Sequence, residues 1–289
     1  VYVINTCSVT ENANKECRQI IKKIKKKSPN SIITVMGCYA QLKPNEIKNI
    51  EGVNLVLGAN EKFKLKEYLK KTTNKDSSVR VQPIEKITSF KQSFSEKHRT
   101  RTFLKIQDGC NYKCSFCTIP LARGKSRSNT VKNVLQQINE LRKKNIKEIV
   151  LTGVNIGDFG INGKNESFLE LLKEIIKIPS IRIRISSIEP NLLSDEILNV
   201  VLKSKNIVPH FHIPLQSGSD KILKLMRRRY RTQDYKKLIQ KIKKYNNSVC
   251  IGADVIVGFP GEENSDFNDT VNFIKSLPIS YLHVFSYSE

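Results

Sequence analysis

The sequence predicts an α/β fold built on parallel strands, arranged as two domains joined by a linker. Short apolar runs alternate with amphipathic helical patterns along most of the chain, which is typical of parallel α/β architecture. The alternation stops at residues 72–100, where polar residues dominate and periodicity is weak. The length of 289 residues suits one large or two ordinary domains, and 39% hydrophobic residues suffice for packed cores.

The first domain is expected over residues 1–71, followed by a linker at 72–100 with room for one short strand. Its apolar runs are typical of buried strands, and the segments between them have helical periodicity. The expected elements are strands at 1–5, 32–38 and 54–58 and helices at 12–27 and 63–71.

The second domain is expected over residues 101–289, as six successive β/α units. Its expected strands lie at 102–106, 147–152, 181–186, 209–213, 249–257 and 280–286. Its expected helices lie at 130–144, 167–177, 194–203, 219–245 and 263–276. Such a series fits an open doubly wound sheet or a partial barrel, and in both the functional residues lie at the carboxyl ends of the strands.

Composition limits what the chain does. No run of 18 apolar residues and no secretory signal is present, so we expect a soluble, intracellular protein without a membrane partner. The net charge of +23 favours nucleic-acid binding, although dispersed lysines are also common on solvated surfaces. The chain opens at Val1 within a strand-like run and stops just after another, so we expect segments to be missing at both ends.

The motif GCNYKCSFC places three of the seven cysteines, Cys110, Cys114 and Cys117, on a loop after the first strand of the second domain. Thiolates are soft ligands for iron–sulfur clusters or zinc. A structural zinc site needs four protein ligands, whereas a cubane held by three leaves one iron open for a small molecule. His98 or His210 as a fourth ligand is the zinc alternative.

This loop resembles that of the radical S-adenosylmethionine (SAM) enzymes, with Phe116 as the aromatic residue before the last cysteine. The resemblance covers residues 102–289 and implies a partial (β/α)6 barrel. It also implies a [4Fe–4S] cluster held by the three cysteines. The open iron of that cluster binds SAM, and an electron from the cluster cleaves SAM to give a deoxyadenosyl radical. The Gly153-Val154-Asn155 turn corresponds to the family's turn for the methionine amino group, so Phe116, Gly153 and Asn155 are expected at the cofactor.

Residues on both sides of the loop resemble the methylthiotransferases within that superfamily. Their first domain holds a second [4Fe–4S] cluster through cysteines in INTC and GCYAQ segments, which are Cys7 and Cys38 here. A third ligand lies upstream in relatives, so the auxiliary cluster is expected to lack one ligand in this chain. Cys17 and Cys250 match no cluster position and are interpreted as an ordinary helix residue and a core residue.

Within this family the chain is most similar to enzymes that methylthiolate threonylcarbamoyladenosine beside the tRNA anticodon. The alternatives are isopentenyladenosine in tRNA, an aspartate of a ribosomal protein, and a non-enzymatic, metal-stabilised RNA-binding module. The segments that carry the resemblance are CTIPLARGKSRS at 117–128, LTGVNIGDFG at 151–160, PLQSGSDKILKLMRRRY at 214–230 and ADVIVGFPGE at 253–262.

Polar residues at other strand ends complete the expected site. Ser187 and Gln216 are predicted to bind the ribose or carboxylate of SAM, and Arg123, Arg127 and Arg228 are predicted RNA-phosphate contacts. The resemblance implies tRNA and a reducing donor such as flavodoxin as partners, with a monomeric, cytoplasmic protein. The small RNA-binding barrel that ends relatives is not found in this sequence.

Overall fold

The structure, a computed structural model, describes residues 1–8, 10–95, 101–161 and 166–288. The chain divides into two compact units, and the division does not follow the sequence in one step. Unit 1 comprises Val1–Thr88, Cys117–Lys125 and Ser288–Glu289. Unit 2 comprises Ser89–Phe116 and Ser126–Tyr287. The predicted linker is therefore shared between the units, since residues 72–88 belong to unit 1.

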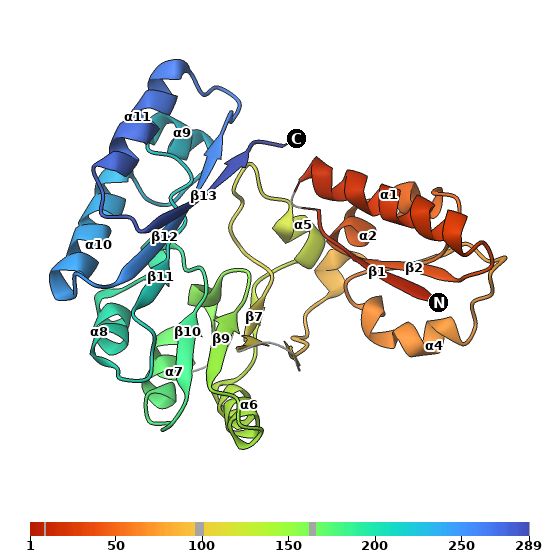
Figure 1. Cartoon of the computed structure of the whole chain (residues 1–289), viewed down its shortest axis with the longest axis horizontal. Coiled ribbons are helices and arrows are strands. Elements are labelled where there is room, and N and C mark those ends of the chain that lie inside the picture. Colours follow the sequence, from red (N-terminus) through yellow and green to blue (C-terminus); the bar gives the residue numbers. More distant parts are fainter. Residues whose placement is uncertain (9, 96–100, 162–165, 289) are drawn as a thin grey trace. The chain divides into compact units, whose positions relative to one another are not determined.

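Unit 1 is built on a four-stranded parallel sheet in the order β1-β2-β3-β4, with helices α1 and α4 on opposite sides of it (Figure 1). The three strands expected from the apolar runs are confirmed, and β4 comes from the predicted linker. Its strands are β1 (Tyr2–Thr6), β2 (Ile33–Gly37), β3 (Val53–Leu57) and β4 (Ser78–Arg80). Its helices are α1 (Glu11–Lys27), α2 (Cys38–Leu42), α3 (Pro44–Lys48), α4 (Leu65–Leu69) and α5 (Ile119–Arg123), with 3-10 turns at Glu61–Lys64 and Ile84–Lys86.

The core of unit 1 explains why α1 forms where it does. Thr10 caps the helix by accepting a hydrogen bond from the Ala13 N–H at 3.2 Å, and three lysines end it. One face of the helix buries Cys17 and Ile21 against Ile33 and Val35 of β2. The helices α2 and α3 were not predicted, because five residues are too few to show helical periodicity.

Unit 2 contains a row of six parallel strands in the order β6-β9-β10-β11-β12-β13. Two single bridges, Ile183 to Ile207 and Ser187 to His212, join β10 to β11 and make the row continuous. The helices lie along one side of this row, as Figure 1 shows for α7, α8, α10 and α11. This is an open, partial barrel, so the predicted fold class is confirmed.

The strands of unit 2 are β5 (Ser93–Phe94), β6 (Thr102–Lys105), β7 (Gln107–Asp108), β8 (Arg127–Ser128), β9 (Glu148–Thr152), β10 (Arg182–Ile185), β11 (His210–His212), β12 (Cys250–Val257) and β13 (Tyr281–Ser286). Its helices are α6 (Val131–Lys143), α7 (Phe168–Ile175), α8 (Asp195–Lys203), α9 (Asp220–Leu225), α10 (Thr232–Tyr245) and α11 (Asn264–Lys275), with 3-10 turns at Ile156–Asp158 and Pro190–Leu192.

The single helix predicted over 219–245 is wrong, because the chain breaks between α9 and α10. Arg227 has a φ of 56°, which a helix does not allow. The buried Tyr230 hydroxyl donates to the carbonyl groups of Pro214 and Leu215 at 2.9 and 2.7 Å. The segment 226–231 thus turns inward to satisfy a buried hydroxyl instead of continuing the helix.

The strands of unit 2 have two different faces. Alternate residues such as Ile149, Ile183, Phe211 and Ile251 are buried in one apolar core with the helices. Six polar or charged residues among the intervening ones form what we call the polar face, namely Arg184, His210, His212, Asp254, Tyr281 and His283; Val150, Ile256 and Phe285 lie on the same side of the strands. This alternation leaves the side of the strands away from the helices available for polar chemistry.

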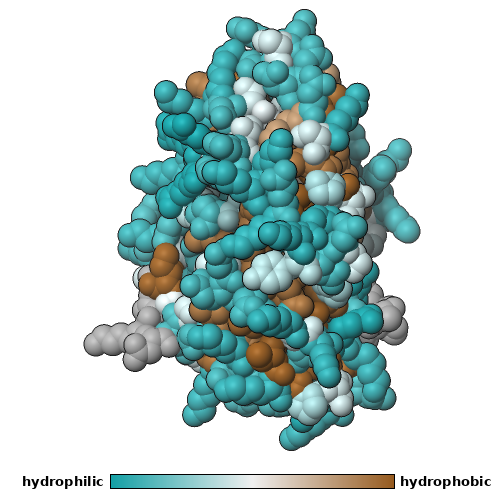
Figure 2. All heavy atoms as spheres, turned by 90° about the vertical axis from the view of Figure 1, so that its left-hand side faces the viewer, coloured by the Kyte–Doolittle hydropathy of each residue, from teal (hydrophilic) through white to brown (hydrophobic). Residues whose placement is uncertain are grey.

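The outer face over the helices of unit 2 is mainly hydrophilic, with apolar side chains scattered among the polar ones (Figure 2). Such a surface fits the net charge of +23 and the many lysines. None of the helices in the described part of the chain is both long and apolar enough to span a bilayer.

Candidate functional site

Gln107, whose side chain is buried, lies at the start of the loop that carries Cys110. This residue was not identified from the sequence. Its Nε2 donates to the Gly109 carbonyl at 2.7 Å and to Ser126 Oγ at 2.9 Å. Its Oε1 accepts from the backbone N–H groups of Val154 and Asn155 at 2.9 and 2.8 Å. Gln107 therefore ties the start of the cysteine loop to the Gly153-Val154-Asn155 turn.

That turn requires glycine at its first position. A Cβ atom at Gly153 would lie 2.8 Å from Gln107 Oε1, so any side chain displaces the amide that organises the loop. Asn155 is buried, and its Nδ2 donates to Asp158 Oδ2 at 3.0 Å. Its Oδ1 makes no hydrogen bond within the described part of the chain. A buried acceptor without a donor fits the predicted contact with a cofactor amino group.

Cys110 and Cys114 belong to unit 2. The Tyr112 N–H lies 3.3 Å from Cys110 Sγ, and Arg228 Nη1 donates to Cys114 Sγ at 3.2 Å. The Ser115 hydroxyl donates to the Leu225 carbonyl at 2.8 Å, which fixes the loop on the end of α9. Donors aimed at sulfur suit thiolates, which carry negative charge as metal ligands.

Arg228 does not fit its predicted contact with RNA phosphate. Its side chain is only 3% exposed and forms an ion pair with Glu189. Its Nε also donates to the Tyr230 hydroxyl at 3.1 Å. Burial raises the pKa of Glu189 above its usual value, and the charge of Arg228 opposes that rise. We therefore correct the prediction for Arg228, because its guanidinium is used inside unit 2, beside Cys114.

The two neighbouring arginines are exposed and better placed to meet solvent or RNA. The Arg229 guanidinium lies 3.8 Å from the centre of the Tyr112 ring, and the Tyr112 hydroxyl accepts from Asn191 Nδ2 at 2.7 Å. Arg227 is exposed at the break between α9 and α10. Arg227 and Arg229 are therefore the exposed arginines of the MRRRY run.

The other predicted RNA contacts have internal partners or lie in unit 1. Arg127 is 11% exposed, with Nη2 at 3.4 Å from Asp108 Oδ2 and Nε donating to the Ser89 carbonyl at 3.2 Å. This internal pairing contradicts the predicted phosphate contact of Arg127. Arg123 lies near the end of α5 in unit 1 and is half-buried.

The remaining predicted cofactor residues lie at different points of unit 2. Phe116 packs against a small apolar cluster of Ile222, Met226 and Phe259. Ser187 Oγ lies 2.6 Å from His212 Nδ1, so its hydroxyl already has a protein partner. Gln216 has a φ of 67° and is buried after β11, where its carbonyl accepts from the Ile256 N–H at 2.9 Å.

Cys7 and Cys38 follow paired strands of unit 1. Thr6 is opposite Gly37 in the β1-β2 register, so the next residue of each strand is a cysteine at the same sheet edge. Gly37 has a φ of 113°, and a Cβ there would lie 2.3 Å from the Thr6 carbonyl oxygen. The strands can therefore approach closely at this edge only with glycine.

Cys117 opens the segment of unit 1 that includes α5. The hydroxyl of the next residue, Thr118, donates to the Ser8 carbonyl at 3.2 Å, directly after Cys7. The helix α5 also contacts α2, which starts at Cys38. Within unit 1, the end of the C-x3-C-x2-C loop is thus attached to the edge that carries the other two cysteines.

The two unassigned cysteines differ in environment. Cys17 is buried in the unit 1 core, and burial raises the pKa of its thiol to about 11. It is therefore a protonated core thiol at neutral pH, as interpreted from the helix pattern. Cys250 is half-buried at the start of β12.

No described histidine is grouped with Cys110, Cys114 and Cys117, as the zinc alternative at those cysteines requires. His98 lies outside them, and His210 Nε2 is bonded to the Tyr281 hydroxyl at 2.9 Å. Across the described ranges, the one cluster of His, Cys, Asp or Glu ligand atoms within 4.8 Å of one another consists of His212, Asp254 and His283.

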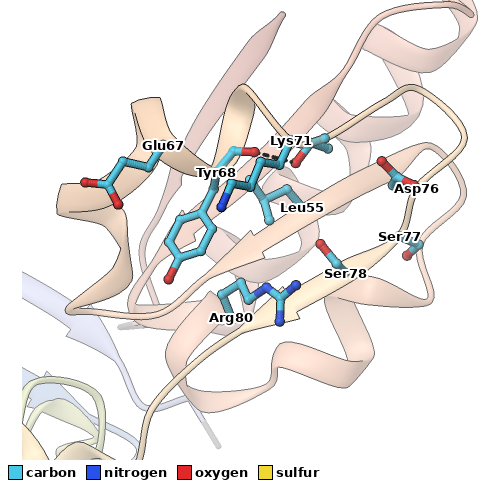
Figure 3. Close-up of a pocket in the computed structure, with 9 residues that line it drawn as sticks. Leu55, Glu67, Tyr68, Lys71, Asp76, Ser77, Ser78 and Arg80 are labelled. Carbon is cyan, nitrogen blue, oxygen red and sulfur yellow. Dashed lines mark hydrogen bonds between the residues drawn. The ribbon is translucent and has the colours of Figure 1, made fainter.

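A pocket of about 530 Å³ lies in unit 1, between α4 and the strands β3 and β4 (Figure 3). It contains none of the predicted site residues. Lys71 and Arg80 line it together with Glu67 and Asp76, so its charges are balanced. This pocket does not coincide with the cysteine chemistry.

Comparison with known families matches both parts of the chain. The radical SAM superfamily matches residues 104–274, and Uncharacterized protein family UPF0004 matches residues 1–58. Curated relatives include the threonylcarbamoyladenosine tRNA methylthiotransferase MtaB of Bacillus subtilis, 42% identical over 100% of this chain and 65% of the relative. MtaB of Aquifex aeolicus is 40% identical over 100% of this chain and 71% of the relative.

A tRNA-2-methylthio-N(6)-dimethylallyladenosine synthase of Clostridium tetani is 34% identical over 100% of this chain and 66% of the relative. The chain thus spans about two thirds of the length of these relatives. Among solved structures, the radical SAM methyltransferase TsrM of Kitasatospora setae aligns with a TM-score of 0.70 at 14% identity, over 98% of this chain and 61% of that one. That likeness concerns the fold alone.

Proposed function

The chain belongs to the methylthiotransferase family of the radical SAM superfamily, and from this we propose that it methylthiolates N6-threonylcarbamoyladenosine at position 37 of tRNA. The methylthio group is added at the C2 carbon of the adenine. One structural observation carries the proposal: Gln107 joins the cysteine loop to a turn whose Asn155 presents an unpaired buried acceptor.

The residues present fit the cofactors that the family implies. Cys110, Cys114 and Cys117 supply three thiolates, the number that leaves one iron of a cubane free for SAM. Asn155 Oδ1 would accept from the amino group of SAM, and Ser187 and Gln216 lie at the ends of later strands for its polar groups. Phe116 would pack against the cofactor from its apolar cluster.

The chemistry explains why no nucleophile and base are needed. A bound [4Fe–4S] cluster with SAM supplies a radical that removes hydrogen from the adenine C2 carbon, which carries no acidic proton. The chain's own residues orient the reactants. Gln107 and Gly153 hold the turn at Asn155 in place. The ion pair with Glu189 holds the buried Arg228 guanidinium beside Cys114.

We further propose that Cys7 and Cys38 hold part of a second [4Fe–4S] cluster, to which the sulfur that receives the methyl group would be attached. Support comes from their placement at one sheet edge by the Thr6-Gly37 pairing. Cys7 and Cys38 would be two of the three thiolates that the family resemblance implies for this cluster.

The partners follow from charge and from the relatives' names. The net charge of +23 attracts tRNA by counterion release, and the exposed Arg227 and Arg229 provide phosphate contacts next to the cysteine loop. Arg123 is retained as a third candidate contact. A flavodoxin-like electron donor, a monomeric state and a cytoplasmic location complete the proposal.

The polar face favours threonylcarbamoyl over isopentenyl as the substituent on the adenine. Its histidines, Asp254 and Tyr281 offer hydrogen bonds that an isopentenyl hydrocarbon cannot use, and desolvating them for an apolar group is costly. A threonylcarbamoyl group carries a hydroxyl, a carboxylate and a urea-type amide, all of which pair with such residues.

The test is anaerobic incubation of the reconstituted protein with SAM, a reductant and two tRNAs that lack the methylthio group. One tRNA carries threonylcarbamoyladenosine and the other isopentenyladenosine. Mass spectrometry of the digested tRNA is expected to show methylthiolation of the threonylcarbamoyl substrate, at least tenfold faster than of the other. Preference for isopentenyladenosine, or product formation by the Cys114→Ala variant, would refute the proposal.

A further inference from the structure

Three neighbouring strands of unit 2 bring together two histidines and an aspartate on the polar face. Asp254 of β12 is directly opposite His283 of β13, and His212 of β11 is opposite Gly252, two residues before Asp254 on the same face. These residues come from separate β/α units. Parallel strand register alone therefore assembles the group, which we call the His-Asp-His group.

The distances within this group resemble those between ligands of one metal ion. Asp254 Oδ1 lies 3.0 Å from His212 Nε2 and 3.1 Å from His283 Nδ1. Two ligands at about 2.1 Å from a metal, separated by 90 to 109°, are about 3.0 to 3.4 Å apart. Asp254 Oδ1 thus has the spacing of an adjacent ligand position to each of the two ring nitrogens, and all three atoms lie within 4.8 Å of one another.

Hydrogen bonding alone does not account for His212. The residue is 8% exposed, and its Nε2 is buried without a hydrogen bond in the described part of the chain, although Asp254 is 3.0 Å away. The two atoms are close without the alignment that an N–H···O bond needs. Asp254 Oδ1 is instead paired with His283 Nδ1 at 3.1 Å, so a cation is the partner that would satisfy His212 Nε2 and the carboxylate together.

Ser187 and Tyr281 hold the His212 ring in place, in the way that hydrogen-bond partners orient a metal-binding histidine. Its Nδ1 is 2.6 Å from Ser187 Oγ, which fixes the ring and leaves Nε2 as the coordinating atom. Tyr281 stacks over the His212 ring with 6.0 Å between ring centres. Gly252 makes room for the Tyr281 ring, because a Cβ atom at residue 252 would lie 2.1 Å from Tyr281 Cζ.

We propose that His212, Asp254 and His283 form a binding site for a divalent first-row transition-metal ion, with Zn²⁺ as the reference ion. Two imidazoles and one carboxylate suit zinc or Fe²⁺ rather than Mg²⁺ or Ca²⁺, which prefer oxygen ligands. The His283 side chain is 54% exposed, so the ion can enter from solvent. Three protein ligands leave at least one coordination position for water or a substrate oxygen.

The site contains no thiolate, although Ser187, which is also proposed to bind SAM, contacts His212. Its test therefore uses protein in which Cys110, Cys114 and Cys117 are serine, so that zinc cannot bind at those thiolates. Zinc binding is measured by equilibrium dialysis with metal analysis and by the zinc-induced rise in Tm. We expect one zinc per chain above that bound by the matched Asp254→Asn protein.

The variants separate the site from general effects on folding. Asp254→Asn and His283→Gln are expected to weaken zinc binding at least 100-fold, and Ser187→Ala about tenfold through the orientation of His212. The matched control is His210→Gln, since His210 is on the same strand and face but outside the group, and its zinc affinity should remain within twofold. His283 is exposed, so its variant should fold even if that of Asp254 does not.

Zinc affinity that is equal in the parent, Asp254→Asn and His283→Gln proteins would overturn the proposal. So would the absence of a zinc-induced rise in Tm in the parent. Either result would leave the His-Asp-His group as a hydrogen-bonded cluster. Both readouts are independent of SAM cleavage and of tRNA, so failure here is distinguishable from failure of the methylthiotransferase proposal.

Discussion

Replacing Arg228 by methionine tests the link between the buried ion pair and the cysteine chemistry. The change removes the partner of Glu189 and the donor to Cys114 Sγ in one step. Breaking a buried pair from one side costs about 3–5 kcal/mol, because the remaining charge is unpaired in a poorly solvated position. We expect a loss of this size in the free energy of unfolding.

The same change should lower the reduction potential of a cluster bound to Cys114. A donor to a ligand sulfur stabilises the reduced, more negative cluster, so its removal makes reduction harder. If the donor favours the reduced state by about 1.4 kcal/mol, its loss lowers a one-electron potential by about 60 mV. A redox titration monitored by EPR measures this shift.

A double variant separates the two effects. Glu189→Gln combined with Arg228→Met removes both charges, so most of the lost stability should return. The potential should remain low, because the donor to Cys114 is still absent. Arg227→Met is the matched control, since Arg227 is exposed and should change neither quantity by a measurable amount. An unchanged potential in Arg228→Met would refute the reasoning.

Three further outcomes are expected. Gln107→Ala should lower SAM affinity about tenfold in a binding titration, since the turn at Asn155 loses two backbone partners; unchanged affinity would contradict this. Cys38→Ala should reduce the iron content of the reconstituted protein. Cys17→Ala should leave the iron content unchanged and lower the free energy of unfolding, measured by chemical denaturation, by about 1 kcal/mol. Loss of iron in both variants would contradict the assignment of Cys38 as a cluster ligand and Cys17 as a core residue. Burial, followed by the charges of Arg184, His212 and Arg101, lowers the pKa of His210 in the folded protein to about 4. The imidazole of His210 is therefore protonated at a higher pH in the unfolded chain than in the folded one. The contribution of His210 to the free energy of unfolding is thus complete above pH 6.5, and about 1–2 kcal/mol of it is lost as the pH falls toward 4. Chemical denaturation at a series of pH values should show this loss in the parent protein and not in His210→Gln.

The alternation of apolar runs was enough to predict the parallel strands, whereas the choice of a partial barrel over an open doubly wound sheet came from the resemblance to the radical SAM enzymes. Each strand has a buried face that the sequence displays, as in Ile149 and Leu151 of β9. The prediction was wrong where a tertiary contact overrides local periodicity. The helix break at Arg227 depends on the buried Tyr230 hydroxyl reaching two carbonyl groups in a distant loop.

The site was predictable only where its residues are close in sequence. Spacing alone identifies Cys110, Cys114 and Cys117 as candidates, whereas Cys7 and Cys38, which are far apart in sequence, were identified through the resemblance of their segments to the methylthiotransferases. The importance of Gln107 depends on contacts with a turn 47 and 48 residues away, which no local pattern reveals.

Other parts of the site depend on contacts between distant segments. The His-Asp-His group depends on strand register across three β/α units. Arginine charge likewise suggested RNA contacts at Arg127 and Arg228, because burial and ion pairing are not visible in sequence.

The most direct test of the central claim is anaerobic reconstitution with iron and sulfide, followed by an iron count and an assay for 5′-deoxyadenosine with SAM and a reductant. The account predicts about four irons per chain at the first cluster and formation of 5′-deoxyadenosine. Both should be lost in Cys114→Ala and kept in the matched Cys250→Ala protein. Zinc in place of iron, or a cluster that never cleaves SAM, would contradict the account and favour a metal-stabilised binding module.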